Sequence, residues 1–245
     1  MTPAEVAATL GPWFAARLAV DRATVVELER HAEGFSWDTW TLAVEASGER
    51  RGYAVRVEPR DGLLAPYDIR GQYALHRAVL DHSDVPMPAL HWLELDPSVL
   101  GMPFFVMERL DGVVPVQWRG KDPAIFPTDE ARREIGLEFV QVLTRIHAID
   151  LEAAGLSFLG GHASSDEAAH AQVARWAAYY ADAVVVELPL VRHALAWLRA
   201  NVATSGRVVL CHGDYRIGNF MLGPDRRIVG VFDWELAHLS DPVED

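Results

Sequence analysis

Apolar and polar positions change their spacing several times along the chain, and each change predicts a different element. Residues 3–18 have apolar side chains at helical spacing, and Gly11-Pro12 predicts a break in this helix or its end. Three runs rich in apolar residues follow, over residues 23–32, 34–46 and 53–57, and Gly48 lies in the turn between the last two. Short apolar runs with a glycine turn are typical of antiparallel strands, so we expect a small sheet here.

The next part of the chain predicts one helix and two more strands. Residues 66–82 have the spacing of a helix, and the prolines at positions 86 and 88 separate it from a strand over residues 89–95. A further apolar run, residues 103–110, leads into Asp111-Gly112, a pair that favours a turn. In the strand at residues 53–57 the side chains alternate, so residues 53, 55 and 57 should face a core and residues 54 and 56 the opposite side.

The second half of the chain is mainly helical. Thr128 or Asp129 can cap a helix that runs to Ile146, and further helices are expected over residues 165–183 and 188–203. Short strands return at residues 208–211 and 228–232, with Gly223-Pro224-Asp225 as a hairpin turn before the second. A sheet-rich first part and a helical second part predict an α+β fold rather than alternating strands and helices.

Composition and charge exclude several classes of protein. The 245 residues include 22 basic and 35 acidic ones, a net charge of −13, which disfavours a nucleic-acid partner. No apolar run approaches the ~20 residues of a membrane-spanning helix, so no membrane partner is expected. The single cysteine, Cys211, excludes a disulfide framework and predicts a cytoplasmic protein. Lys121 is the only lysine, and nothing in the sequence predicts the oligomeric state.

The residues with the clearest chemistry lie near the end of the chain. Asp214 and Asn219 are five residues apart on one expected loop, and the strand at residues 228–232 leads directly into Asp233. Oxygen ligands such as those of Asn219 and Asp233 suit Mg²⁺, while Asp214 can orient a hydroxyl group or accept its proton. An Asp that addresses the nucleophile, with an Asn and a second Asp that hold the metal, is the residue set that phosphoryl transfer requires.

The two segments 212–222 and 228–242 resemble the catalytic loop and metal-binding motif of the aminoglycoside phosphotransferase and choline kinase-like family, which is related to protein kinases. Residues 96–108 resemble the branch of this family that is attached to acyl-CoA dehydrogenase-like proteins. The resemblance implies a bilobal protein-kinase-like fold, with a nucleotide-binding lobe at residues 1–108 and a catalytic lobe at residues 109–245. It also implies that C-terminal helices typical of the family are missing from this chain.

The resemblance further assigns residues to the nucleotide, which would be ATP or GTP. The turn at residues 33–38, with Gly34 and Ser36, would cover the phosphates, although a plain hairpin turn predicts the same residues. Arg56 stands where the family usually has a phosphate-binding lysine, and the alternative is that its side chain projects into solvent. Gln72 stands where the family is expected to have the glutamate that pairs with this lysine. Glu108 belongs to the connector whose backbone would meet adenine.

Arg216 matches a position that often contacts the transferred phosphate in protein kinases, and an ordinary ion-paired arginine is the alternative. His212 is expected to pack and hydrogen-bond rather than to act as a base.

These residues are consistent with three different functions. The leading one is an O-phosphotransferase that uses Mg²⁺ with ATP or GTP and a small-molecule acceptor such as an aminoglycoside, a macrolide, a choline-like or an acyl-linked hydroxyl compound. The second is a nucleotide-binding pseudoenzyme, suggested by Arg56 and Gln72. The third is a metal-dependent hydrolase that would use His212, Asp214, Asp233 and His238.

Overall fold

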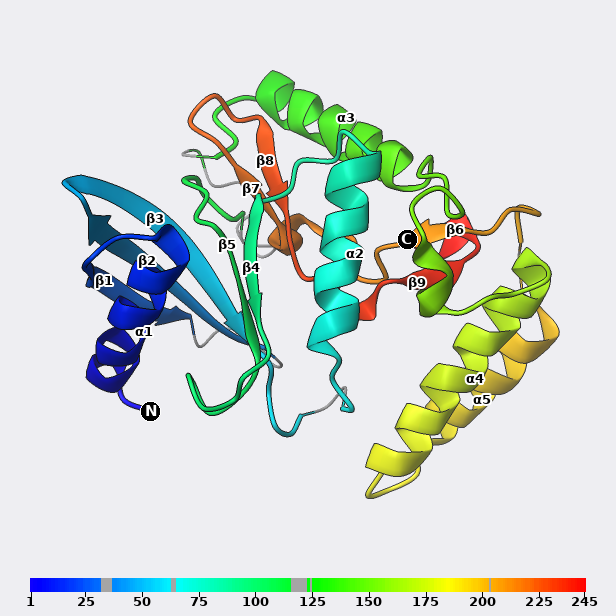
Figure 1. The fold of residues 1–245 in the computed structure, drawn as a ribbon. Helices are drawn as coiled ribbons and strands as arrows, with labels where there is room; N and C mark the ends of the chain where they lie inside the picture. Colours follow the sequence, from blue (N-terminus) through cyan, green and yellow to red (C-terminus); the bar gives the residue numbers. More distant parts are fainter. Residues whose placement is uncertain (32–36, 63–64, 116–122, 124, 203) are drawn as a thin grey trace. The chain divides into compact units, whose positions relative to one another are not determined.

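The computed structural model describes residues 1–31, 37–62, 65–115, 123, 125–202 and 204–245. The chain forms two compact units (Figure 1). Unit 1 comprises Met1–Leu80 with Pro86–Val113, and unit 2 comprises Asp81–Val85 with Val114–Asp245.

Unit 1 is built on a five-stranded antiparallel sheet in the order β1-β2-β3-β5-β4. Its strands are β1 (Ala23–His31), β2 (Asp38–Ala46), β3 (Glu49–Val57), β4 (Leu90–Glu94) and β5 (Phe104–Glu108). The turn between β2 and β3 consists of Ser47 and Gly48, both at positive φ (52° and 81°), as a tight two-residue hairpin requires. The third strand therefore begins at Glu49, earlier than predicted, because its exposed polar start carries no apolar pattern.

The two faces of the sheet bury different side chains. Tyr53, Val55 and Val57 lie in one core cluster with residues of α1 (Pro3–Leu18), while Ala54 lies in another with Ile69 of α2 (Ile69–His82). The predicted alternation along this strand is thus confirmed. The predicted break in the first helix is wrong.

Helix α1 continues through Pro12 because apolar side chains on both sides of the proline pack against the same core. Val6, Leu10 and Phe14 lie in the core cluster on the sheet, whereas Pro12 is exposed. Apolar burial on this scale outweighs the loss of one helical hydrogen bond, which is the main cost of a proline within a helix.

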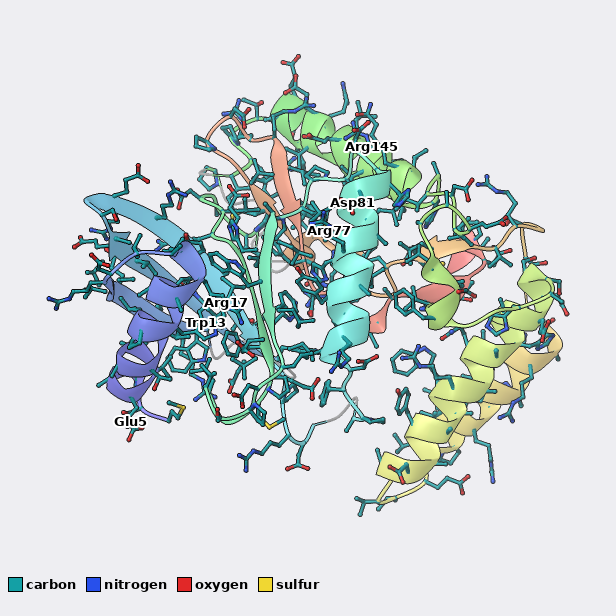
Figure 2. The ribbon with its side chains drawn as sticks, viewed as in Figure 1. Glu5, Trp13, Arg17, Arg77, Asp81 and Arg145 are labelled. Carbon is teal, nitrogen blue, oxygen red and sulfur yellow. The ribbon has the colours of Figure 1, made fainter. Side chains whose placement is uncertain are left out.

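A partly buried carboxylate joins α1 to the sheet. Glu94 accepts hydrogen bonds from Trp13 Nε1 (2.8 Å) and Arg17 (2.7 Å), and Figure 2 shows both side chains on the side of α1 toward the sheet. Burial alone would raise the pKa of Glu94, but the hydrogen bonds from Trp13, the Asp96 amide and Arg17 outweigh it and hold the pKa at about 2. This pair of contacts positions the helix that covers one face of the sheet.

Unit 2 contains three long helices and two small sheets. The helices are α3 (Asp129–Ile146), α4 (Ser165–Ala183) and α5 (Pro189–Ala200), and α4 and α5 form an antiparallel hairpin (Figure 1). Thr128 is the N-cap of α3, since its hydroxyl accepts from the Ala131 amide at 3.1 Å. Among the described residues, no helix is both long and apolar enough to cross a lipid bilayer.

The short strands of unit 2 pair in two antiparallel ladders. One joins β6 (Val209–Cys211) to β9 (His238–Ser240), and the other joins β7 (Phe220–Leu222) to β8 (Ile228–Val231). The sequence predicted β6, β8 and the hairpin turn at residues 223–225, but not β7 and β9. Each of these has only three residues, too few for a visible alternation.

Candidate functional site

The loop that follows β6 begins with a sharp change of chain direction at a glycine. Pairing of β6 with β9 ends at Cys211 opposite His238, and Gly213 then adopts a φ of +82°. A Cβ atom at position 213 would lie 2.4 Å from the carbonyl oxygen of Leu236. Only glycine therefore fits both the backbone conformation and the space at this point.

His212 is a buried link within the loop. Its side chain is 0% exposed, its Nε2–H donates to the carbonyl of Phe232 at 2.8 Å, and its Nδ1 accepts from the Asp214 amide at 3.3 Å. Burial lowers the pKa of His212, so the ring is neutral with its proton on Nε2. Both nitrogens are occupied, which agrees with the expected packing role and leaves neither nitrogen for a metal or a substrate proton.

Three predicted site residues meet at one carboxylate oxygen. Oδ2 of Asp214 accepts from Arg216 Nε at 2.8 Å and from Asn219 Nδ2 at 2.7 Å. The Nδ2 of Asn219 also donates to the Asp214 carbonyl at 2.9 Å. Among the described residues, no hydrogen bond to Oδ1 of Asp214 is formed, and the Asp214 side chain is 36% exposed. Asp214 thus combines a fixed orientation with a second carboxylate oxygen that accepts no hydrogen bond from the described part of the chain.

The β7–β8 ladder brings Asp233 next to this cluster. The amide of Phe232 donates to the carbonyl of Asn219 at 2.7 Å, so Asp233 is one residue from a direct backbone link to Asn219. Asp233 itself has a left-handed backbone (φ 64°) at the start of the 3-10 turn Trp234–Leu236. Because the NH₂ group of Asn219 is used within the loop, its carboxamide oxygen is the atom that it can offer to a cation. An amide oxygen and a carboxylate are a donor set that suits Mg²⁺.

His238 does not join this cluster as a ligand. Its Nδ1 lies 2.7 Å from the Leu236 carbonyl and its Nε2 lies 2.9 Å from Glu244. Both ring nitrogens therefore face protein oxygens. The hypothesis of a metal-dependent hydrolase is therefore disfavoured, because His212 and His238, two of the four residues it would use, face protein groups with both ring nitrogens.

Two structural contacts of the loop gave no recognisable signal in the sequence. Tyr215 donates from its hydroxyl to the carbonyl of Phe139 in α3 at 2.7 Å, and the two rings are 4.3 Å apart. The Asp245 carboxylate accepts hydrogen bonds from the amides of both His212 and Gly213, each at 2.8 Å. Both contacts join residues far apart in the chain, so only the folded structure reveals them.

The residues predicted to bind nucleotide are found in unit 1. Arg56 is 7% exposed rather than projecting into solvent, and its guanidinium carbon lies 5.2 Å from the ring centre of Trp37. Gln72 lies in the first turn of α2, where its carbonyl oxygen is 2.9 Å from His76 Nδ1. The amide of Glu108 donates to the Ala89 carbonyl at 2.8 Å. Gly34 and Ser36 lie outside the described residues.

Known proteins resemble this chain over most of its length. A model of the phosphotransferase enzyme family matches residues 27–245. Acyl-CoA dehydrogenase family member 10 of Mus musculus is 32% identical over 198 residues, which make up 80% of this chain and 18% of that protein. The chain therefore spans only a small part of this curated relative.

Solved structures resemble the fold. One that is assigned as an aminoglycoside phosphotransferase from Ralstonia eutropha is 27% identical with a TM-score of 0.71, and the match covers 96% of this chain and 66% of that chain. A thermostable mutant of aminoglycoside phosphotransferase APH(4)-Ia, solved with ADP and hygromycin B, is 17% identical with a TM-score of 0.62. That match covers 96% of this chain and 74% of the other, and it shows likeness of fold alone.

Proposed function

Because this chain belongs to the phosphotransferase enzyme family, we propose that it transfers the terminal phosphate of ATP or GTP to a hydroxyl group of a small molecule. One observation supports this most strongly. Asp214 is oriented by Asn219 and Arg216 through one of its oxygens, and Phe232, the residue before Asp233, is hydrogen-bonded through its amide to the Asn219 carbonyl. This arrangement supports the assignment of Asp214 as the nucleophile-orienting carboxylate and of Asn219 and Asp233 as the two oxygen ligands that phosphoryl transfer requires.

In this proposal Asp214 handles the proton of the acceptor. The hydroxyl oxygen of the acceptor forms a bond to the terminal phosphorus, the bond from that phosphorus to the bridging oxygen breaks, and the hydroxyl proton passes to Oδ1 of Asp214. The products are a phosphate monoester and the nucleoside diphosphate. Arg216 and Asn219 hold Oδ2, so the other oxygen keeps a fixed direction toward the hydroxyl group.

Asn219 and Asp233 would hold Mg²⁺ together with the oxygens of the nucleotide. Mg²⁺ is seldom bound by protein groups alone, so the two side chains and the phosphates would share it. When bound, the ion neutralises charge on the β- and γ-phosphates. The residues of this chain supply the carboxamide oxygen, the carboxylate and the rigid ladder that joins them.

The nucleotide would bind through residues of unit 1. Arg56 is proposed to contact the phosphates, with Gln72 near it, Gly34 and Ser36 in the covering turn and Glu108 beside the base. Support comes from the buried setting of Arg56, since a buried guanidinium forms strong charge-assisted hydrogen bonds with phosphate oxygens. ADP is bound in the structure of APH(4)-Ia, which favours an adenine nucleotide. The acceptor class is open to aminoglycosides, macrolides and other hydroxylated compounds.

A second candidate is a nucleotide-binding protein with little or no transfer activity. Arg56 and Gln72 favour it, because an arginine and a glutamine replace the lysine and glutamate that the family usually pairs. Arginine keeps the positive charge, but its planar group presents its donors in a different geometry from an ammonium group. The two candidates share nucleotide binding and differ in phosphate transfer.

Phosphorus NMR of the protein with Mg²⁺, ATP or GTP and a panel of hydroxylated compounds separates the candidates. We expect a phosphate monoester signal with wild-type protein and a loss of about 10²–10⁴-fold in Asp214→Asn, with nucleotide affinity unchanged. Asp225→Asn is the matched control, because within the part of the chain that the structure describes this carboxylate accepts only from the Arg227 amide, in the β7–β8 turn. Equal activity in Asp214→Asn and wild type would reject the proposed role. Nucleotide binding without transfer to any acceptor would favour the pseudoenzyme.

A further inference from the structure

Arg56 and Trp37 form a buried cation–π pair on one face of the sheet in unit 1. In the ladder of β2 with β3, Thr39 lies opposite Arg56, so Trp37, which precedes Thr39 by two residues, is a diagonal neighbour of Arg56 on the same face. The guanidinium carbon lies 5.2 Å from the centre of the indole ring. Trp37 is 5% exposed and Arg56 is buried as well, so the pair is shielded from water, where a cation–π contact is strongest.

The indole ring is held in place by several elements of unit 1. Trp37 lies in a core cluster with Ile69 of α2 and Phe105 of β5. The ring of Tyr67, in the segment before α2, meets it edge-on with the ring centres 5.8 Å apart. An arginine side chain has several rotatable bonds, so a fixed ring that restrains its guanidinium group lowers the entropy lost when that group binds a ligand. Trp37 is therefore suited to hold Arg56 in one orientation.

The pair gives a physical reason for an arginine at position 56. A guanidinium group is planar and stacks on an aromatic face, whereas the ammonium group of a lysine is a compact charge on a flexible stem. The guanidinium group binds two phosphate oxygens with the N–H groups along its edge, and stacking uses its face instead. Stacking on Trp37 thus sets the plane in which Arg56 presents its N–H groups.

A second cation–π pair in the same sheet provides a matched comparison. Trp40 of β2 lies in the other core cluster, and the guanidinium carbon of its cross-strand partner Arg30 is 5.6 Å from the centre of its ring. Arg30 is exposed, and its Nε donates to Asp38 at 3.1 Å. Trp40 therefore stacks on an arginine that is ion-paired at the surface, whereas the arginine that stacks on Trp37 is buried.

We propose that Trp37 is a positioning residue for nucleotide binding, and that its ring holds the guanidinium plane of Arg56 in the orientation that binds the phosphates. This inference rests on the proposed function, because it takes Arg56 as the phosphate contact, but it does not depend on transfer to an acceptor. It predicts that Trp37 affects the affinity for ligands that carry phosphates and not the affinity for adenosine.

Calorimetry of the whole chain with Mg²⁺ and a non-hydrolysable ATP analogue tests the proposal. Trp37→Leu removes the aromatic face and should weaken binding of the analogue by about five-fold or more, while the affinity for adenosine stays within about two-fold of wild type. Trp37→Phe keeps a ring and should retain most of the affinity. The Nε1–H lost in Trp37→Phe has no hydrogen-bond partner within the described part of the chain, so the variant breaks no such bond there.

Trp40→Leu is the matched control, because it removes a buried tryptophan and a cation–π pair from the same strand. It should leave the affinity for the ATP analogue within about two-fold of wild type, since its partner Arg30 is not a proposed phosphate contact. Equal weakening in Trp37→Leu and Trp40→Leu would overturn the proposal. Equal weakening of analogue and adenosine binding in Trp37→Leu would also overturn it, because both results indicate general damage to unit 1.

A double-mutant cycle tests the stacking itself. In the Arg56→Lys background, Trp37→Leu should weaken binding of the ATP analogue by less than about two-fold, because an ammonium group has no planar face to lose. The same loss in the wild-type and Arg56→Lys backgrounds would overturn the proposal.

Proton NMR of the wild-type chain tests the pair without any Trp37 variant, so a failure of Trp37→Leu to fold leaves the proposal testable. The side-chain signals of Arg56, identified by their loss in Arg56→Lys, should lie at higher field than those of exposed arginines. They should shift when the ATP analogue binds and stay unchanged with adenosine. Arg56 signals at ordinary positions, or unchanged by the analogue, would overturn the inference. The expected shifts and affinities without phosphate transfer to any acceptor would overturn only the proposed function.

Discussion

Gly213→Ala places a methyl group at the point where the loop is most tightly packed. The added Cβ would lie 2.4 Å from the Leu236 carbonyl oxygen and 3.0 Å from the Leu236 side chain. The nearest atom belongs to the backbone, so a change of rotamer cannot relieve the overlap. Either the loop or the turn at residues 234–236 must move.

Two costs add in this variant. Alanine at a φ of +82° costs roughly 1–2 kcal/mol for the left-handed backbone. The overlap adds about 1–3 kcal/mol, as for other overpacked sites. Gly206→Ala has the same φ of +82° with nothing within 4 Å of the added methyl group, so it should carry the first cost only. We therefore expect Gly213→Ala to be less stable than Gly206→Ala by about 1–3 kcal/mol.

Urea unfolding, followed by tryptophan fluorescence, provides the comparison. Trp234, one of the eight tryptophans that contribute to the signal, is fully buried and its ring centre is 4.7 Å from that of His212, so part of the signal comes from beside the loop. Gly213→Ala should have the lower midpoint of the two variants. The same midpoint for both variants would refute the packing argument, because backbone strain alone would then explain the loss.

Two other residues give predictions of different kinds. Arg56→Ala should weaken nucleotide binding by about ten-fold or more in calorimetry, because a charge-assisted contact is worth roughly 1.5–3 kcal/mol. Arg56→Lys should recover part of this loss. Unchanged nucleotide affinity in Arg56→Ala would place the phosphate contact elsewhere. Glu94→Gln should lower the free energy of unfolding by about 2–3 kcal/mol at neutral pH, because the pKa of Glu94 is held at about 2 against an ordinary value of 4.5. A carboxylate whose pKa is lowered by folding stabilises the folded protein above pH ~4.5, and this stabilisation is lost as the pH falls toward 2. The difference in the free energy of unfolding between wild type and Glu94→Gln should therefore shrink over that range in urea titrations. A constant difference would contradict the assignment.

The sequence predicted most of the fold because its long elements have strong periodic patterns. The α+β, kinase-like class is confirmed, and the fourth helix was placed at the residues it occupies, Ser165–Ala183. The errors arose where tertiary contacts outweigh local preference. Packing of Phe14 and its neighbours on the sheet carries α1 through Pro12, and the three-residue strands β7 and β9 depend on their partners.

The candidate site was predictable only in part. Asp214, Asn219 and Asp233 have a recognisable spacing, and the structure joins Asn219 by hydrogen bonds to Asp214 and to Phe232, the residue before Asp233. The burial of Arg56 beneath Trp37 could not be predicted, because it depends on which face of the sheet is covered. Asp245 lies 33 residues from His212, and no local pattern marks a carboxylate that accepts backbone amides at that separation.

Electron paramagnetic resonance of Mn²⁺, used in place of Mg²⁺, tests most directly whether Asn219 and Asp233 form a metal–nucleotide site. The account predicts that the protein captures Mn²⁺ together with a non-hydrolysable ATP analogue and much less without it, since the phosphates supply the remaining ligands. Capture should be lost in Asp233→Asn and reduced in Asn219→Ala, while Asp225→Asn should behave as wild type. Undiminished capture of the Mn²⁺ complex by Asp233→Asn and Asn219→Ala would contradict the account.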